Sequence, residues 1–369
     1  KFDVMKVMNI IWFSGRHFDD LCATTQKSLA KGLVNKGHQL TFVNPDPNGS
    51  HEGYPWTHQG LPIKSLPGLK SLSVGRKMSH WLKQNPPSPD TIAILDWRIA
   101  NKLAPQLDKF SIPWILMDRS PPADGNILSR LQWYFWKRSW NMVKKRPDGV
   151  GCVVSNSHKE FIINKLSIEE KKLIPIPAGV DLELFKVGDK KPSLQLSYHG
   201  RVDKNRGLME LIKIHSQLLK EGLDVTLNIH GKGNARPIIQ NYQSEKVNIT
   251  DSLETDKLAK LSSSYDIGFL PMPNRKVWRL ASPLKRSEYL ASGMIVLGID
   301  HSGHQIEDSG DWLQLFDEDN FVESSVRVIK NLETIKLREL QKGARLFAES
   351  TLDWSKSVDI LDGLLSKQS

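Results

Sequence analysis

The sequence contains no hydrophobic run that approaches the ~20 apolar residues of a membrane-spanning helix. Hydrophobic residues make up 39% and charged residues 25% of its 369 residues, which is typical of a globular protein in water. The first apolar stretch, from Met8 to Phe13, is short and runs into Ser14 and Gly15, so it favours a buried strand over a secretion signal. The sequence therefore predicts a cytoplasmic protein and not an integral membrane protein.

Cysteine is also scarce. The two cysteines, Cys22 and Cys152, cannot build a disulfide framework, and neither has His or Cys neighbours at the spacing of a zinc site. We expect a reducing compartment and no bound metal.

The chain lacks a Gly-x-Gly-x-x-Gly fingerprint and a Walker loop, yet its elements alternate as in nucleotide-binding α/β proteins. Each half opens with an apolar strand, a glycine turn, a helix and a second strand, which predicts two doubly wound parallel sheets. Strands are expected over 7–13, 39–43, 91–95, 114–117, 149–155, 194–199, 224–230, 267–271 and 295–299. We expect Rossmann-like domains over 1–187 and 188–350, followed by a C-terminal helix over 351–369.

Acidic residues are in the minority, with 41 Asp and Glu against 51 Lys and Arg, which gives a net charge of +10. Such an excess favours an anionic partner, such as nucleotide phosphates, acidic lipid headgroups or nucleic acid. Charge alone does not choose among these partners. Because the sequence carries no recognised nucleic-acid-binding motif, we expect no nucleic-acid partner.

Two glycines, Gly15 and Gly200, stand where a predicted strand ends and a helix follows. Glycine lets the backbone approach a phosphate, and the N-terminus of the next helix offers free N–H groups. The second glycine is followed closely by Arg201, Lys204 and Arg206, whose side chains suit a diphosphate. The alternative is an ordinary turn followed by a solvated basic loop.

A second cluster lies in the run SPLKRSEYLASG, residues 282–293. Pro283 suits the first turn of a helix, and Glu288 follows Lys285 at a spacing of three, which places both on one helix side. A cation on the phosphates and a carboxylate on the ribose hydroxyls are a common way to bind a nucleotide diphosphate. The alternative is an ion pair on the protein surface.

A basic, tryptophan-rich helix is predicted over residues 127–146. The stretch contains six basic residues, three tryptophans and no acid. This composition is typical of a helix that lies in a membrane interface, and it would place the protein peripherally on an anionic inner membrane face. The alternative is a helix packed on the core with a solvated basic face. A smaller basic run, Lys70 to Lys83, would add to the same surface.

Five stretches occur in the order and spacing of glycosyltransferase family 4, which the chain therefore resembles. They are IPAGVDLELF (176–185), HGRVDKNRG (199–207), NIHGKGN (228–234), SYDIGFLPM (264–272) and PLKRSEYLASGMIVLG (283–298). The resemblance implies the GT-B fold, with two Rossmann-like domains facing a central cleft and a C-terminal helix that crosses back to the first domain. It also implies that the first domain binds the acceptor and the second binds the nucleotide sugar.

The implied activity is a retaining transfer from a UDP- or GDP-sugar co-substrate to a glycan or a lipid-linked acceptor, with no bound cofactor or metal. Arg201 and Arg206 are expected to stabilise the leaving diphosphate, Glu288 to bind the ribose, and Asp118 to stand in the donor-sugar pocket. The other expected donor-binding positions are Gly15, Gly200, Gly231, Lys232, Ser282, Pro283, Leu284 and Lys285.

One position departs from the family pattern. The family's first glutamate, which contacts the donor sugar, would lie at position 280, where this chain has Leu280. A non-catalytic or atypical nucleotide-sugar-binding protein with the GT-B fold is therefore the alternative to a transferase.

Overall fold

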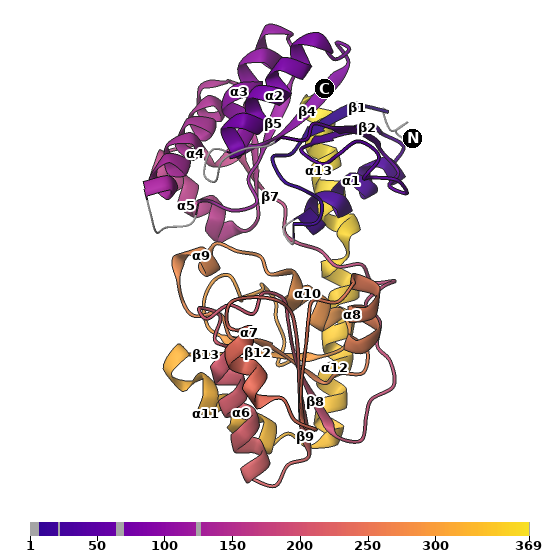
Figure 1. The fold of residues 1–369 in the computed structure, drawn as a ribbon, viewed down its shortest axis with the longest axis vertical. Coiled ribbons are helices and arrows are strands. Elements are labelled where there is room, and N and C mark those ends of the chain that lie inside the picture. The colour runs from indigo at the N-terminus through magenta and orange to yellow at the C-terminus, as the bar shows by residue number, and fades with distance from the viewer. Residues whose placement is uncertain (1–6, 21–22, 64–69, 123–126, 369) are drawn as a thin grey trace. The chain divides into compact units, whose positions relative to one another are not determined.

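A computed structural model describes residues 7–20, 23–63, 70–122 and 127–368 of the chain (Figure 1). The chain divides into two compact units. Unit 1 comprises residues 1–177 and 354–369, and unit 2 comprises residues 178–353. Each unit is built on a parallel sheet with helices between its strands, which confirms the expected α/β class.

The sheet of unit 1 has seven parallel strands in the order β3-β2-β1-β4-β5-β6-β7. The order reverses at β1, which pairs with both β2 and β4. Ligands of such sheets bind at the carboxyl ends of the strands beside the reversal. The strands are β1 (Asn9–Phe13), β2 (Gln39–Asn44), β3 (Thr57–Gly60), β4 (Thr91–Asp96), β5 (Trp114–Met117), β6 (Gly151–Val153) and β7 (Leu173–Pro175).

Helices cover both faces of this sheet because successive side chains of a strand point to opposite faces. Ile11 and Phe13 of β1 belong to the core under α2 to α5, whereas Ile10 and Trp12 belong to the core under α1 and α13. The helices are α1 (Thr24–Asn35), α2 (Lys70–Gln84), α3 (Trp97–Lys109), α4 (Ile127–Lys145), α5 (Asn156–Leu166) and α13 (Trp354–Gln368).

The C-terminal helix α13 packs on α1 of unit 1, as the sequence predicted (Figure 1). Val358 and Leu361 are buried in the same core as the α1 residues Leu29 and Leu33. A Cβ on Gly32 of α1 would lie 2.2 Å from a methyl carbon of Val358, so a glycine is needed for this close approach.

The sheet of unit 2 has six parallel strands in the order β10-β9-β8-β11-β12-β13, with the reversal at β8. Its strands are β8 (Leu194–His199), β9 (Val225–His230), β10 (Val247–Thr250), β11 (Ile267–Leu270), β12 (Ile295–Ile299) and β13 (Leu313–Phe316). Its helices are α6 (Leu208–Lys220), α7 (Arg236–Ile239), α8 (Thr255–Ser262), α9 (Lys276–Arg279), α10 (Leu284–Ala291), α11 (Phe321–Lys330) and α12 (Thr334–Phe347).

The boundary between the two units lies earlier in the chain than the sequence predicted. Residues 178–187 were expected in the first domain, but Val180 and Phe185 are buried in the core of unit 2. Val180 also forms a parallel bridge with Asp353, which lies at the other end of the unit. Residues 186–192, a polar stretch that contains a glycine, a proline and the predicted boundary, are therefore part of unit 2. A π-helical turn, Ala348–Leu352, precedes α13.

No helix among the described residues is long and apolar enough to cross a membrane.

Candidate functional site

Two glycines meet at the carboxyl ends of β8 and β9. Gly200 directly follows β8 with a φ of 120°, and Gly231 directly follows β9. A Cβ on Gly231 would lie 1.7 Å from the carbonyl oxygen of Gly200, so only glycine fits there. A Cβ on Gly200 would lie 3.2 Å from Nζ of Lys285. Backbone without a covering side chain and a lysine amine therefore lie together at the reversal of this sheet.

Lys285 stands in the first turn of α10, and its side chain is buried. Its Nζ lies 4.0 Å from the sulfur of Met272 and 4.1 Å from the ring centroid of Tyr198. Burial, followed by repulsion from Arg206, holds the pKa of Lys285 well below its ordinary value, although Glu288 acts in the opposite direction. Among the described residues, a sulfur and an aromatic ring are the near partners of this buried amine, which is therefore suited to donate to an incoming anion.

Both predicted arginines lie close to Asp203. The Nε of Arg201 lies 3.1 Å from one carboxylate oxygen of Asp203, and its Nη2 lies 3.2 Å from the other. The guanidinium of Arg206 lies over the ring of Trp278 at 4.4 Å. Its buried Nε lies 3.9 Å from a carboxylate oxygen of Asp203 and has no hydrogen-bond partner among the described residues. Arg206 is therefore held flat against an indole with donor capacity unused. The side chain of Arg201 is half exposed and would have to exchange Asp203 for a phosphate.

Glu288 is held by a histidine that the sequence analysis did not single out. The Nε2 of His199 lies 2.6 Å from a carboxylate oxygen of Glu288, and the backbone N–H of His199 donates to the hydroxyl of Tyr289. Both side chains of the pair are largely buried. Burial, followed by the neighbouring His199, lowers the pKa of His230 to about 4. Glu288 is thus fixed on the same helix side as Lys285, one turn further along α10.

The turn before α10 carries the remaining predicted positions of unit 2. The hydroxyl of Ser282 accepts a hydrogen bond from the backbone N–H of Ala178, and Pro283 is the N-cap of α10. The first N–H groups of a helix have no acceptor within it, so the turn at Leu284 offers donors to an anion. Lys232 is exposed, and Leu280 is buried at the end of α9.

The structure contradicts the placement of Asp118 in a sugar pocket. Asp118 follows β5 in unit 1 and is fully buried. One of its oxygens accepts hydrogen bonds from the indole N–H groups of Trp136 at 2.6 Å and Trp140 at 2.9 Å, and the other accepts from the backbone N–H of Ser120. A carboxylate without exposed surface cannot touch a sugar, so Asp118 ties α4 to the sheet. Gly15 follows β1, also in unit 1.

The same contacts correct the interpretation of residues 127–146. Trp136 and Trp140 are fully buried and Trp133 is partly buried, so these tryptophans are core residues and not interfacial anchors. Lys144 donates to the carbonyl of Leu166, and Arg146 pairs with Asp148 at 3.0 Å. Within residues 127–146, the basic residues with exposed side chains and no partner among the described residues are Arg130, Lys137, Arg138 and Lys145.

A histidine and aspartate cluster at the end of β2 was also missed. Asp46 accepts hydrogen bonds from Asn44, from the backbone of Phe18 and from His51, and its other oxygen lies 2.6 Å from Nδ1 of His17. Ligand atoms of His17, Asp19 and Asp46 lie within 4.8 Å of one another, close enough to share a cation. Because both oxygens of Asp46 are already engaged, the cluster is explained by its own hydrogen bonds.

Comparisons with known proteins agree with this architecture. Residues 23–184 match the family model "Glycosyltransferase Family 4", and residues 193–332 match the model "Glycosyl transferases group 1". No curated protein sequence matches the chain.

Solved structures of similar fold cover almost the whole chain. A glycosyltransferase from Rickettsia africae has a TM-score of 0.73 at 14% identity and covers 98% of this chain and 99% of its own. Sucrose-phosphate synthase from Thermosynechococcus elongatus has a TM-score of 0.77 at 14% identity, with 98% of both chains covered. The Anabaena protein HepE in complex with UDP-glucose has a TM-score of 0.70 at 12% identity and covers 97% of this chain and 100% of its own. At these identities the likeness shows the fold, which is GT-B.

Proposed function

The chain belongs to glycosyltransferase family 4, and we propose that it transfers a sugar from a nucleoside-diphosphate donor to a glycan or lipid-linked acceptor with retention of configuration. The observation that carries the proposal is Lys285, a buried amine beside the bare backbone of Gly200 that has no carboxylate hydrogen-bonded to it among the described residues. A diphosphate supplies the missing acceptor. Glu288, one turn along the same helix, is then within reach of the ribose hydroxyls.

In the proposed transfer, the bond between the anomeric carbon and the diphosphate oxygen breaks while a bond to the acceptor oxygen forms on the same face of the sugar. The acceptor's proton passes to the departing diphosphate, so no separate protein base is required. The charge that develops on the diphosphate is stabilised by Lys285, Arg206 and the N–H groups at the start of α10. Arg201 adds to them once it exchanges Asp203 for a phosphate oxygen.

The donor is proposed to be a UDP- or GDP-sugar that binds without a metal ion. The complex of the Anabaena protein HepE with UDP-glucose favours UDP. The cations of this site can offset the diphosphate charge that a divalent ion neutralises in other enzymes. Localisation in the cytoplasm, where such donors would be met, is part of the proposal.

Leu280 supports a second candidate, a protein that binds nucleotide sugars without transferring them. Its side chain is apolar and buried where the family has a glutamate that contacts the sugar. The neighbouring Arg279 is exposed and can replace part of that contact with a cation. The nucleotide half of the site is the same for both candidates.

The ribose role of Glu288 is tested by Glu288→Ala. We expect UDP or GDP affinity to fall about tenfold to a hundredfold, because hydrogen bonds to a charged group are worth roughly 1.5–3 kcal/mol. Calorimetric titration measures the affinity. Glu245→Ala, which removes an exposed carboxylate elsewhere in unit 2, is the matched control and should bind normally. Unchanged affinity of Glu288→Ala would remove this residue from the ribose role.

Association with an anionic membrane face through α4 is also proposed. The contact would be made by exposed side chains of this helix and not by its buried tryptophans. On this helix the exposed residues Leu131 and Tyr134 are followed by Lys137 and Arg138, whose side chains have no partner among the described residues. Lys137→Gln/Arg138→Gln should reduce sedimentation with vesicles of phosphatidylcholine and phosphatidylglycerol, because each basic residue near such a surface contributes about 1 kcal/mol. Lys257→Gln/Lys260→Gln on α8 is the control. Equal sedimentation of both variants would favour a solvated basic face.

A further inference from the structure

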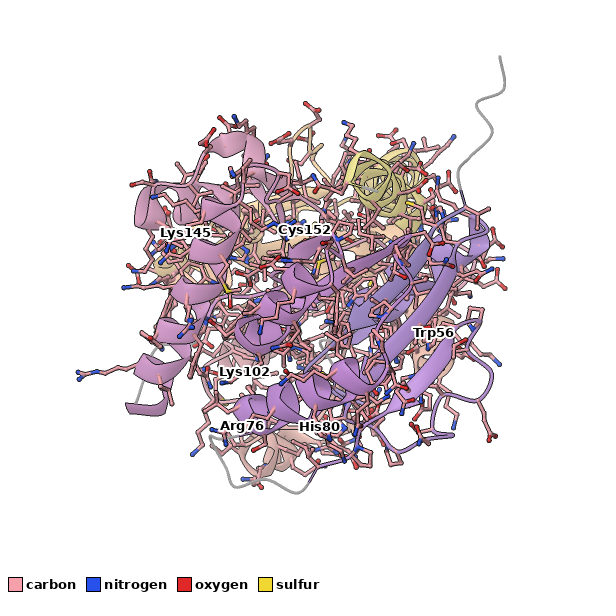
Figure 2. The ribbon with its side chains drawn as sticks, turned by 90° about the horizontal axis from the view of Figure 1, so that it is seen from above. Trp56, Arg76, His80, Lys102, Lys145 and Cys152 are labelled. Carbon is pink, nitrogen blue, oxygen red and sulfur yellow. The ribbon has the colours of Figure 1, made fainter. Side chains whose placement is uncertain are left out.

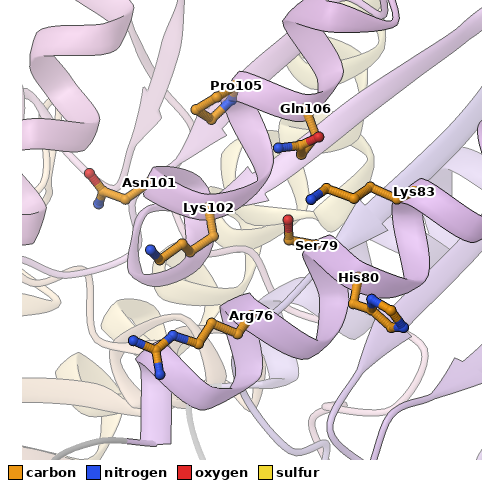
Figure 3. Close-up of a pocket in the computed structure, with 8 residues that line it drawn as sticks. All are labelled: Arg76, Ser79, His80, Lys83, Asn101, Lys102, Pro105 and Gln106. Atoms are coloured by element: carbon orange, nitrogen blue, oxygen red, sulfur yellow. The ribbon is translucent and has the colours of Figure 1, made fainter.

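The helix layer of unit 1 contains a basic groove that the proposed transfer does not use. It lies between α2 and α3 and has a volume of about 370 Å³. Arg76, Ser79, His80, Lys83, Asn101, Lys102, Pro105 and Gln106 line it (Figure 3). None of these eight residues is acidic. The volume is at the small end of the range for ligand pockets and is sufficient for a phosphate-bearing group.

The spacing of the lining residues explains why they converge. On α2 they recur at i, i+3, i+4 and i+7, and on α3 at i, i+1, i+4 and i+5, so each set lies on one helix side. Gly75 lets the helices approach, since a Cβ there would lie 3.2 Å from Cγ of Lys102. In Figure 3, the side chain of Lys83 reaches from α2 into the space beside α3, and the side chains of Arg76 on α2 and Lys102 on α3 extend to the same side of the view. Figure 2 shows Arg76, His80 and Lys102 on one side of the layer.

The polar groups of the groove are largely unused within the protein. Among the described residues, the side chains of Arg76, Ser79, His80, Lys83 and Lys102 have no hydrogen-bond or ion-pair partner. The acid nearest in sequence, Asp108 of α3, accepts from the indole of Trp114 and pairs with Arg146. Three cations gathered in one groove repel one another unless an anion lies between them.

We propose that the groove between α2 and α3 binds a phosphate group. A guanidinium fork, two ammonium groups, an imidazole, a hydroxyl and the amide of Gln106 supply the several donors that the oxygens of a phosphate need. The amide of Asn101 already donates to Phe135 and Ser139. A single carboxylate would leave most of these donors unused. The phosphate belongs either to a soluble phosphorylated compound or to a lipid headgroup, and the two sources are separable by experiment. This site lies in unit 1, so it is distinct from the donor site around Lys285 in unit 2.

The test compares two groove variants with a matched control. Lys83→Gln/Lys102→Gln removes two cations, and Ser79→Glu places a carboxylate among intact cations. Lys257→Gln/Lys260→Gln removes two exposed lysines from α8 of unit 2, neither of which has a partner in the described part of the chain. Inorganic tripolyphosphate is titrated by calorimetry, and vesicles of phosphatidylcholine with about one third phosphatidylglycerol are used in sedimentation. UDP titration shows whether the donor site and the fold are intact in each variant.

We expect both groove variants to lose affinity about tenfold or more in at least one arm while UDP binding and the control variant stay unchanged. Loss in the tripolyphosphate arm alone identifies a soluble phosphorylated ligand, and loss in the vesicle arm alone identifies a lipid headgroup. Equal binding of wild type and both groove variants in both arms overturns the proposal. So does an equal loss in the control, or an affinity for poly-glutamate as high as that for tripolyphosphate, because either result would reflect general attraction to negative charge.

Discussion

Asp118 and Lys285 are both buried charged residues, but their surroundings differ. Asp118 has its oxygens occupied by two indole N–H groups and a backbone N–H. Lys285 has a sulfur and an aromatic ring near its amine. A buried polar group with its partners in place stabilises a fold, whereas one without them lowers stability. Lys285 therefore has the environment expected of a ligand-binding residue, and Asp118 that of a structural one.

Lys285→Met should weaken nucleotide binding and stabilise the free protein. Below pH ~10.5 the unfolded chain holds the lysine proton, whereas burial disfavours that proton in the fold, so the lysine lowers stability increasingly as the pH falls toward its folded pKa. Methionine has a similar length and no charge. We expect UDP affinity to fall at least about tenfold and the melting temperature to rise.

The control for this variant is Lys257→Met on α8, where the lysine is exposed. It should change neither the affinity nor the melting temperature. If Lys285→Met bound UDP as wild type does, Lys285 would not contact the diphosphate. If it lowered the melting temperature instead, the lysine would have a stabilising partner that its surroundings do not show.

Single residues were predictable where a motif placed a charge at a helix start. Lys285 and Glu288 could be found from the run SPLKRSEYL because helix geometry puts them on one side. Asp118 was misplaced because its partners, Trp136 and Trp140, come from a helix that is distant in sequence. His199 was missed although it directly precedes Gly200, since nothing in the sequence indicates that it faces Glu288 of another element.

Among the elements, α13 is attached to unit 1 by a polar network as well as by its apolar face. The Nδ1 of His38 accepts from the backbone N–H of Met8, so its Nε2 donates to Asp362 of α13 at 2.8 Å. The other oxygen of Asp362 lies 3.0 Å from Nζ of Lys36. One carboxylate therefore joins α13 to the residues before β1 and β2.

Asp362→Asn should destabilise unit 1 by about 1–3 kcal/mol, because it weakens a buried charged hydrogen bond and an ion pair together. Chemical denaturation followed by tryptophan fluorescence measures the loss. Asp359→Asn is the matched control, since Asp359 pairs with the same Lys36 at 2.7 Å but is more than half exposed. Its loss should stay below about 1 kcal/mol. Equal effects of the two variants would mean that the His38 contact adds nothing.

Strand prediction succeeded at the centre of each sheet and failed at the edges. The expected ranges of β5, β8 and β12 agree with the structure residue for residue. No strand was predicted from the sequence at four places where the structure has one. These are β3, β7, β10 and β13, and all four are edge strands. Central parallel strands are apolar throughout because both faces are covered, whereas an edge strand such as Thr57–Gly60 is short and polar and looks like a loop.

At the scale of the whole chain, the repeated βαβ order predicted two doubly wound sheets, and both are present. The boundary between the units was predicted less well because a polar Gly- and Pro-containing stretch indicates exposure and not domain membership. Residues 178–187 precede that stretch but contribute Val180 and Phe185 to the core of unit 2. The residues proposed for the donor site come from motifs in the sequence. The groove between α2 and α3 could not be predicted in this way, because it depends on how two helices pack.

The proposed function is the transfer of a sugar from a nucleoside-diphosphate donor held by Lys285 and Glu288. Its most direct test is the release of UDP or GDP from a panel of nucleotide sugars offered together with a panel of glycan and lipid-linked acceptors. We expect acceptor-dependent release from at least one donor, which is lost in Lys285→Met and retained in Lys257→Met. Nucleotide binding without release from any donor would contradict the proposed transfer. It would favour the second candidate, a protein with Leu280 that binds nucleotide sugars without transferring them.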